Sequence, residues 1–341
     1  MESLDLRVLA DALAWRTAGH AVTLVTVVQT WGSAPRPPGA LLAVRDDGVV
    51  SGSVSGGCVE DDLIARTKAS FKATDRDTPA LCKPAMIVYG VSQEEAARFG
   101  LPCGGTLRLV QEPLLDTAWV AQLLARTADH QLVARTLTLA SGAVQLSSAV
   151  RGQTMTFDGS TLTTVFGPKW RLLLIGAGQL SQAVAQIALM LDFEVLVCDP
   201  REEYAATLMA GLPGMADIRR VEGMPDDVVR EMAPDAHTAI VALTHDPKLD
   251  DMALLEALKS HAFYVGALGS RRNQDARKQR LAEHFDLSHE ELERLHGPVG
   301  LALGAKTPAE IAVSIVAEIV QVKNAVAGAA AALTLAGCVL A

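Results

Sequence analysis

The chain contains 341 residues, 50% of them hydrophobic and 20% charged, so it is long enough to bury two cores and form two domains. The formal net charge of −9 and the aromatic content of only 4% argue against a basic groove or a stacking surface, so we expect no nucleic-acid partner. The N-terminus lacks the pattern of a secretory signal peptide, and five cysteines is an odd number, so we expect reduced thiols in a cytoplasmic protein.

The first half of the chain predicts an N-terminal mixed α+β domain over residues 1–166. Leu6, Leu9 and Leu13 recur at helical spacing, which indicates an amphipathic helix. The segment Asp46-Asp47-Gly48 is typical of a hairpin turn between two strands. Two further helices are expected over residues 59–70 and 119–127. The expected strands are residues 21–29, 40–44, 49–54, 85–89, 106–111, 132–139, 143–148 and 154–157.

The second half, residues 167–324, predicts a Rossmann-like dinucleotide-binding domain. From Arg171 onward strands alternate with helices, which is typical of an α/β fold with a doubly wound parallel sheet. The last long helix has a clear start, because Thr307 is a suitable N-cap, Pro308 follows it, and Glu310 completes a capping box. The expected strands are residues 172–175, 194–198, 218–221, 238–243 and 262–265.

An apolar tail, residues 325–341, carries no charge and is rich in alanine. Its 17 residues fall short of the roughly 20 that a spanning helix needs, so we expect no membrane segment. We expect instead that the tail extends the last helix and packs on the body or on a second copy of the chain, as in a homodimer.

A glycine loop follows the first strand of the second half. In the order Gly176-Ala177-Gly178 the first glycine makes a tight turn, and the second lets backbone N–H groups approach a pyrophosphate at the start of a helix. Ser181 takes the third small position, which allows close packing. Asp199 ends the next strand, where it can accept a hydrogen bond from a ribose hydroxyl, whereas the nearby Arg201 can take a phosphate. The alternative is a tight turn without a ligand.

Two more loops follow strands of the same sheet, where ligands of open α/β sheets bind. Thr244-His245-Asp246 offers an acid–base or metal pair, but no third ligand lies at metal-like spacing, so no metal site is expected. Gly269-Ser270-Arg271, followed by Arg272, is suited to hold an anion. The alternative for the two arginines is a solvated helix start.

Two cysteines of the first half are each flanked by a pair of glycines. Cys58 follows Gly56 and Gly57, and Cys103 precedes Gly104 and Gly105. Glycine pairs suit a turn that presents a thiol to a ligand, whereas a cysteine used only for packing has no need of them. Cys58 also precedes a predicted helix, whose dipole favours the thiolate, and Arg36 is a further candidate neighbour. The alternative is a pair of buried free cysteines.

These motifs together resemble the XdhC/CoxI family of xanthine dehydrogenase accessory and molybdenum-cofactor maturation factors. The resemblance covers residues 4–322. In the first half it rests on Gly32-Ser33-Ala34-Pro35-Arg36, Gly39-Ala40, the segment 52–60 and Leu101-Pro102-Cys103-Gly104-Gly105. In the second half it rests on the segments 175–178, 199–201, 244–246, 264–266, 269–271, 298–301, 304–305 and 307–315. The chain departs from the family at Gln179-Leu180-Ser181, where His-Val-Gly is usual, and at Pro247 and Ala302.

The resemblance implies a cofactor chaperone that is not an enzyme in its own right. Such a protein binds the molybdenum cofactor, as molybdopterin or a dinucleotide form, assists its sulfuration with a cysteine desulfurase, and delivers it to an apo xanthine dehydrogenase or related molybdenum hydroxylase. No catalytic residue is expected. The residues expected to bind the cofactor are Ser33, Arg36, Gly56, Gly57, Cys58, Cys103, Gly104, Gly105, Gly176, Gly178, Ser181, Asp199, Arg201, Thr244, His245, Asp246, Gly269, Ser270 and Arg271.

The hypothesis places the thiols of the first domain opposite the phosphate-binding loop of the second. Thiolate is a soft ligand suited to a sulfur-rich centre. Two alternatives stay open at this point. One is an NAD(P)-dependent oxidoreductase with His245 as general acid. The other is a scaffold that docks a desulfurase to its client. Residues 335–341 also resemble the first strand of molybdenum-cofactor nucleotidyltransferases, which would suit the beginning of a fused third domain.

Overall fold

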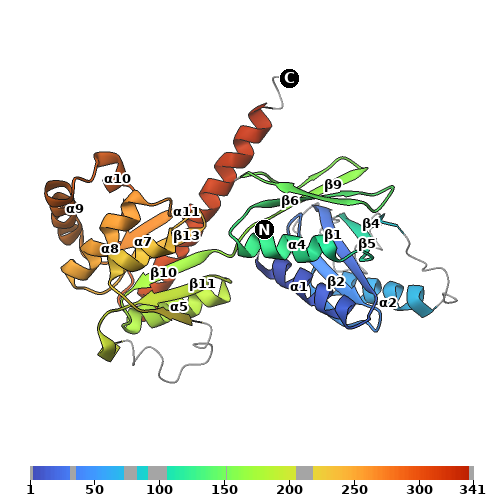
Figure 1. Cartoon of the computed structure of the whole chain (residues 1–341), viewed down its shortest axis with the longest axis horizontal. Helices are drawn as coiled ribbons and strands as arrows, with labels where there is room; N and C mark the ends of the chain where they lie inside the picture. The colour runs from blue at the N-terminus through green and yellow to red at the C-terminus, as the bar shows by residue number, and fades with distance from the viewer. Residues whose placement is uncertain are drawn as a thin grey trace. The chain divides into compact units, whose positions relative to one another are not determined.

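The computed structural model describes residues 3–30, 36–72, 83–90, 106–150, 152–204 and 218–337 (Figure 1). The chain divides into two compact units, Met1–Pro168 and Lys169–Ala341. Ser33, Cys103, Gly104 and Gly105 lie outside the described residues, as does the side chain of Cys58.

The first unit is built on an antiparallel sheet whose central strand is buried on both faces. The helix α2 (Cys58–Lys72) packs on one face, to which Val25 and Val27 of the central strand contribute. The helices α1 (Ser3–Thr17) and α4 (Ala118–Ala128) pack on the opposite face. In pairing order the strands are β3 (Val50–Gly52), β2 (Leu41–Arg45), β1 (Val22–Thr30), β5 (Leu107–Pro113) and β4 (Ala85–Tyr89).

A second antiparallel sheet completes the first unit. Its strands pair in the order β7 (Val144–Ser148), β6 (Val133–Thr138), β9 (Thr161–Phe166) and β8 (Thr156–Phe157). The strand β9 was not predicted from the sequence. Its residues alternate between buried and half-buried positions, and three of the six are threonines, so no hydrophobic run marked the strand.

The second unit confirms the predicted Rossmann-like fold, since six strands form an all-parallel sheet. In spatial order they are β12 (Ile218–Val221), β11 (Glu194–Cys198), β10 (Arg171–Ile175), β13 (Thr238–Ala242), β14 (Tyr264–Ala267) and β15 (Leu295–His296). The chain leaves β10 toward β11 and later returns to β13 on its other side. The order therefore reverses between β10 and β13, which is the position where open α/β sheets bind their ligands.

Helices cover both faces of this sheet. On one face, α5 (Gln179–Met190) and α11 (Pro308–Gly337) enclose a core that includes Val184 and Ile315. On the other face, Val229 and Leu254 lie in a second core. The helices on that side are α7 (Pro225–Met232), α8 (Pro247–Lys259), α9 (Arg271–Phe285) and the short α10 (His289–Glu293).

Helix α11 begins as the sequence predicted. The backbone N–H of Glu310 donates to Thr307 Oγ1 at 3.3 Å, and the N–H of Thr307 donates to the Glu310 carboxylate at 3.0 Å. The helix continues through Gly337, so the described part of the apolar tail is helical, and what it packs against stays a prediction. Within the described ranges, no helix is both long and apolar enough to cross a membrane.

Candidate functional site

The glycine loop lies where the order of the sheet reverses. Gly176 follows β10 with φ of 109°, a conformation that side chains other than glycine rarely adopt. A Cβ atom at this position would lie 3.0 Å from the backbone nitrogen of Thr244, at the end of β13. The neighbouring Leu243 N–H donates to Ile175 O at 2.8 Å. Gly176 is therefore needed for the loop to pack against the adjacent strand.

Gly178 has a different role, because it is the N-cap of α5 and no side chain of the described residues caps this helix. A Cβ atom at Gly178 would meet no atom of the described residues within 4 Å, so they leave the space in front of the helix open. The first N–H groups of α5 and the positive end of its dipole face that space, which is the arrangement that binds phosphates in dinucleotide folds. Ser181 is buried in the first turn, and its Oγ has no hydrogen-bond partner among the described residues.

The carboxylate of Asp199 accepts hydrogen bonds from both the glycine loop and Arg201. One carboxylate oxygen accepts from Ala177 N–H at 2.9 Å and from the Arg201 guanidinium at 2.9 Å; the other accepts from Arg201 N–H and Nε. Burial would raise the pKa of Asp199, but these hydrogen bonds outweigh it and lower the pKa below its ordinary value. A carboxylate has about four acceptor positions, and four hydrogen bonds occupy them here. The predicted ribose contact stays a prediction, and it would require one of these bonds to be replaced.

Arg201 lies at the same edge and is partly exposed, with 27% of its side chain accessible. Its guanidinium lies 4.2 Å from the ring centroid of Tyr204, so the two side chains stack. The hydrogen bond to Asp199 raises the pKa of Arg201, and the nearby charge of Asp246 adds to the shift. Arg201 is therefore a fixed cation next to the glycine loop.

The loop after β13 presents His245 to solvent. This residue has φ of 63°, a left-handed conformation that is uncommon outside glycine. The His245 ring is exposed and makes no hydrogen bond or ion pair with another described residue. Asp246 does not orient it, because the Asp246 carboxylate caps helix α8 by accepting from Lys248 N–H at 2.9 Å. The structure thus brings His245 and Asp246 to the predicted edge but does not join them in an acid–base pair.

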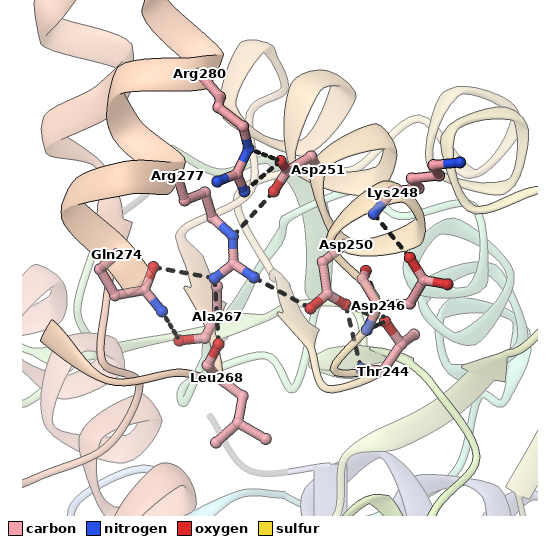
Figure 2. A network of polar contacts seen from close by, with 10 residues as sticks. All are labelled: Thr244, Asp246, Lys248, Asp250, Asp251, Ala267, Leu268, Gln274, Arg277 and Arg280. Atoms are coloured by element: carbon pink, nitrogen blue, oxygen red, sulfur yellow. Dashed lines mark hydrogen bonds and ion pairs between the residues drawn. The ribbon is translucent and has the colours of Figure 1, made fainter. Parts of the chain in front are cut away.

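A buried network that the sequence analysis did not predict holds this loop in place (Figure 2). Thr244 donates from its hydroxyl and its backbone N–H to Asp250 Oδ1, at 2.6 and 3.1 Å. The other oxygen of Asp250 accepts from Arg277 at 3.2 Å, and Arg277 also donates to Asp251 at 3.0 Å. Asp250 is fully buried, and this burial raises its pKa despite the opposing effects of Thr244 and Arg277.

The same arginine reaches the loop after β14. Arg277 donates to Leu268 O at 3.2 Å and to the side-chain oxygen of Gln274 at 3.0 Å, while Gln274 donates to Ala267 O at 2.9 Å (Figure 2). Arg280, one turn further along α9, donates to Asp251 from the exposed side. One buried guanidinium therefore connects the loops that follow β13 and β14.

The third predicted loop forms the start of α9. Ser270 caps the helix by accepting from Asn273 N–H at 3.3 Å, and Gly269 precedes it with φ of 149°. Arg271 and Arg272 are exposed in the first helical turn, and neither has a hydrogen bond or ion pair to another described residue. Both cations are available to an anion at this edge. The described residues contain no group of three or more His, Cys, Asp or Glu that could hold a metal ion.

In the first unit, the carboxylate of Glu60 accepts hydrogen bonds from the loop that precedes Cys58. Its carboxylate accepts from the N–H groups of Val54, Ser55, Gly56 and Gly57 at 2.8–3.0 Å, from the hydroxyl of Ser53 at 2.6 Å, and from that of Ser55. Burial would raise the pKa of Glu60, but these hydrogen bonds, led by that of the Ser53 hydroxyl, hold it well below its ordinary value. Glu60 was not predicted as a site residue, although an acid at the third position of a helix is a capping signal.

Two of the predicted residues of this loop have positive φ, 94° at Gly56 and 157° at Gly57, and Cys58 is the first residue of α2. Arg36 donates from Nε to Ser53 O at 3.3 Å. The structure therefore brings Arg36, the two glycines and Glu60 together at the start of α2. How this loop is placed relative to the glycine loop of the second unit stays a prediction.

The two units define a class of protein, one in which a mixed α+β domain precedes a Rossmann-type domain. The model of the XdhC Rossmann domain matches residues 172–319, and the model of the XdhC and CoxI family matches residues 15–78. A probable xanthine dehydrogenase subunit from Bacillus subtilis strain 168 is 30% identical over 329 residues, which cover 89% of this chain and 94% of that protein. This chain therefore belongs to the XdhC and CoxI family.

One further relative and one solved structure are also similar to this chain. The molybdenum cofactor insertion chaperone PaoD of Escherichia coli strain K12 is 28% identical over 330 residues, which cover 93% of this chain and 87% of that protein. A crystal structure from Bacillus halodurans, described as that of a xanthine dehydrogenase, has the same fold. Its TM-score is 0.73 at 24% identity, and the match covers 95% of this chain and 96% of that one.

Proposed function

We propose that this chain is a maturation factor that binds the molybdenum cofactor as cargo, assists its sulfuration, and helps to insert it into a xanthine dehydrogenase-type molybdenum hydroxylase. The observation that carries the proposal is the similarity to an insertion chaperone over 93% of this chain, which includes both units. The relative from Bacillus subtilis, named as a probable component of xanthine dehydrogenase, supports the class of client.

The second unit offers what an anionic cargo needs. The phosphate of the cargo would lie in front of Gly178, where no described side chain caps α5 and the first N–H groups of the helix are directed. Arg271 and Arg272 supply exposed positive charge at another loop of the same edge of the sheet. Residues 244–246 are held between these loops by the buried Arg277 network. This arrangement suits either the monophosphate of molybdopterin or the diphosphate of its dinucleotide form.

The first unit offers a sulfur ligand. Cys58 begins α2, where the helix dipole favours a thiolate, and the turn in front of it is fixed by Glu60. A thiolate suits a soft, sulfur-rich centre. We include Cys103 in the site on the sequence pattern alone. A cysteine desulfurase as sulfur source, a homodimeric state and a cytoplasmic location complete the proposal.

The alternative function is an NAD(P)-dependent oxidoreductase, which the glycine loop favours. The hydrogen bonds of Asp199 argue against an oxidoreductase. Ala177 and Arg201 fill the acceptor positions of this carboxylate, so none is left for a ribose diol. His245 would be the general acid, but it lacks an orienting partner among the described residues.

The experiment is a reconstitution with an apo-hydroxylase from a host that lacks the cofactor. Cofactor, a cysteine desulfurase with cysteine, and the full chain are combined, and hydroxylase activity is followed over time. We expect faster and more complete activation with the chain present than with the same concentration of albumin. Equal activation in both mixtures contradicts the proposal, and steady turnover of NAD(P)H by the chain alone favours the oxidoreductase.

A further inference from the structure

A polar layer lies inside the core of the first unit, between its two sheets. It consists of Thr26, Glu112, Arg135 and Thr164, all of which are at most 4% exposed. Leu24 of β1 pairs with Glu112, and Arg135 of β6 pairs with Thr164, so strand alternation directs these side chains to the same interior. Apolar residues flank the layer on both sides, Val22, Leu24, Val133 and Phe166 on one and Val28, Val110, Leu137 and Leu162 on the other.

The polar groups of this layer are only partly paired. Arg135 donates to Glu112 Oε2 at 2.5 Å, and its guanidinium lies 4.2 Å from the ring centroid of Trp119. Glu112 Oε1, Arg135 Nε and the hydroxyls of Thr26 and Thr164 have no hydrogen-bond partner in the part of the chain that the structure describes. A buried polar atom without a partner costs free energy, so a carboxylate kept half-paired in a core requires an explanation.

A cavity of about 350 Å³ adjoins this layer. Glu112 and Trp119 form part of its lining, and Asp116 contributes a second carboxylate. Pro84, Leu114 and Val144 supply apolar walls. Only 6% of the Glu112 side chain is exposed. Arg135 neutralises one of the two carboxylates, so the lining keeps an excess of negative charge and of hydrogen-bond acceptors.

We propose that this cavity binds a small molecule whose edge carries guanidine-type N–H donors on an apolar or planar body. Adjacent N–H groups of that type match a carboxylate, as in arginine–carboxylate pairs, and Glu112 keeps acceptor positions for them. The apolar walls and the indole of Trp119 suit the body of the molecule. The volume lies in the range of small-molecule sites. The inference concerns the first unit alone. Its pteridine case rests on the proposed function, because the molybdenum cofactor carries the same 2-amino-4-oxo ring, whereas its alkylguanidinium case does not.

Two sources share this chemistry, an alkylguanidinium and the cyclic acylguanidine of a 2-amino-4-oxopteridine. Isothermal titration calorimetry of the full chain with agmatine, with pterin and with lumazine separates them. Lumazine has the same ring system as pterin but carries oxygen in place of the 2-amino group. We expect agmatine or pterin to bind one site per chain, and lumazine to bind at least about tenfold more weakly than pterin.

Two variants locate the binding. Glu112→Gln weakens binding at least about tenfold if the carboxylate accepts the donor edge, which corresponds to about 1.4 kcal/mol. Because this change also touches Arg135, a second variant, Ala143→Trp, fills the cavity from an exposed position of its lining and abolishes binding without a change in the melting temperature. Asp129→Asn, an exposed acid outside the lining, is the control and leaves binding unchanged.

The outcomes are separable. Binding of agmatine alone identifies an alkylguanidinium site, and binding of pterin but not lumazine identifies a pteridine site; either result supports the inference. Absence of binding by both at millimolar concentration overturns it, as does equal binding of pterin and lumazine, or binding that Ala143→Trp leaves intact. A chain that fails these tests can still carry the molybdenum cofactor, so failure here and failure of the proposed function are distinguishable.

Discussion

The carboxylate of Glu60 accepts a hydrogen bond of 2.8 Å from the backbone N–H of Gly57, so the third residue of α2 holds the glycine that precedes the helix. The same carboxylate holds every residue of the turn from Ser53 to Gly57. Glu60 is therefore a positioning residue for Cys58, because it fixes the turn on which this cysteine begins its helix.

Replacing Glu60 with glutamine removes the charge and leaves a single acceptor oxygen for several donors. We expect Glu60→Gln to lower the free energy of unfolding by about 1–3 kcal/mol, measured by urea denaturation. The exposed neighbour Asp61→Asn is the control, with a change of at most about 0.5 kcal/mol. Equal losses in the two variants would contradict the role of Glu60.

Glu60 also predicts a pH dependence. Its pKa is lowered in the folded protein, so its contribution to stability is complete above the ordinary glutamate pKa and is lost as the pH falls below that value toward the folded pKa. We expect the difference in unfolding free energy between wild type and Glu60→Gln to shrink as the pH is lowered from about 7 to about 3. A difference that stays constant over this range would contradict the assignment.

The two glycines of the nucleotide loop predict opposite outcomes for the same substitution. Gly178→Ala places a methyl group in open space at a negative φ, so we expect the unfolding free energy to change by less than about 1 kcal/mol. Binding of a phosphate-bearing ligand should fall at least about tenfold, because the methyl group occupies the approach to the N–H groups of α5.

Gly176→Ala is the matched variant. The added Cβ would lie 3.0 Å from Thr244 N at a φ of 109°, so we expect a loss of about 1–3 kcal/mol in unfolding free energy. Thermal unfolding and nucleotide titration of both variants test the pair. A stable Gly178→Ala protein with unchanged ligand affinity would exclude the space in front of α5 as the binding site.

Two arginines of α9, the buried Arg277 and the partly exposed Arg280, should differ in their contribution to stability. Arg277→Gln leaves Asp250 without its cation in a fully buried position, and we expect it to cost about 3–5 kcal/mol. The side chain of Arg280, which also pairs with Asp251, is 40% exposed. We therefore expect Arg280→Gln to lower the free energy of unfolding by about 1 kcal/mol or less. Chemical denaturation measures both, and similar costs would show that the network does not depend on burial.

The cysteines differ in predicted reactivity. Burial raises the pKa of Cys198 to about 12, and the charges of Asp199 and Asp226 add to this shift, so its thiol stays protonated and inaccessible. Cys58 begins a helix and should react as a thiolate. We expect iodoacetamide at mildly alkaline pH to alkylate Cys58 and spare Cys198, as measured by peptide mass spectrometry. Alkylation of Cys198 at an equal or higher rate would contradict this difference.

The glycine loop could be predicted from the sequence because its signals are local. A hydrophobic strand, two glycines and a helix follow one another, and the structure confirms β10 within a residue and the helix α5 directly after the loop. Asp199 also lies at the predicted end of β11. The hydrogen-bond partner of Asp199 could not be predicted. Its carboxylate could accept from a ribose hydroxyl or from Arg201, and only the side-chain geometry decides between the two.

The remaining features depend on contacts between distant segments. Arg277 meets Asp250 and Asp251 only because α8 and α9 pack side by side, and no pattern within either helix indicates the pairing. Glu112 and Arg135 look like exposed charges in their strands until a second sheet covers them. Glu60 is the exception, since its signal is local and was visible in the sequence as an acid three residues after Gly57.

The molybdenum cofactor itself provides the most direct measurement. The full chain is purified by gel filtration from a host with active cofactor synthesis, and molybdenum and released pterin are measured by mass spectrometry in the protein fractions. We expect both to coelute with the chain in equal amounts, and to be reduced in Cys58→Ala but not in Cys198→Ala. Fractions of folded protein that contain neither molybdenum nor pterin would contradict the proposal that this chain carries the cofactor.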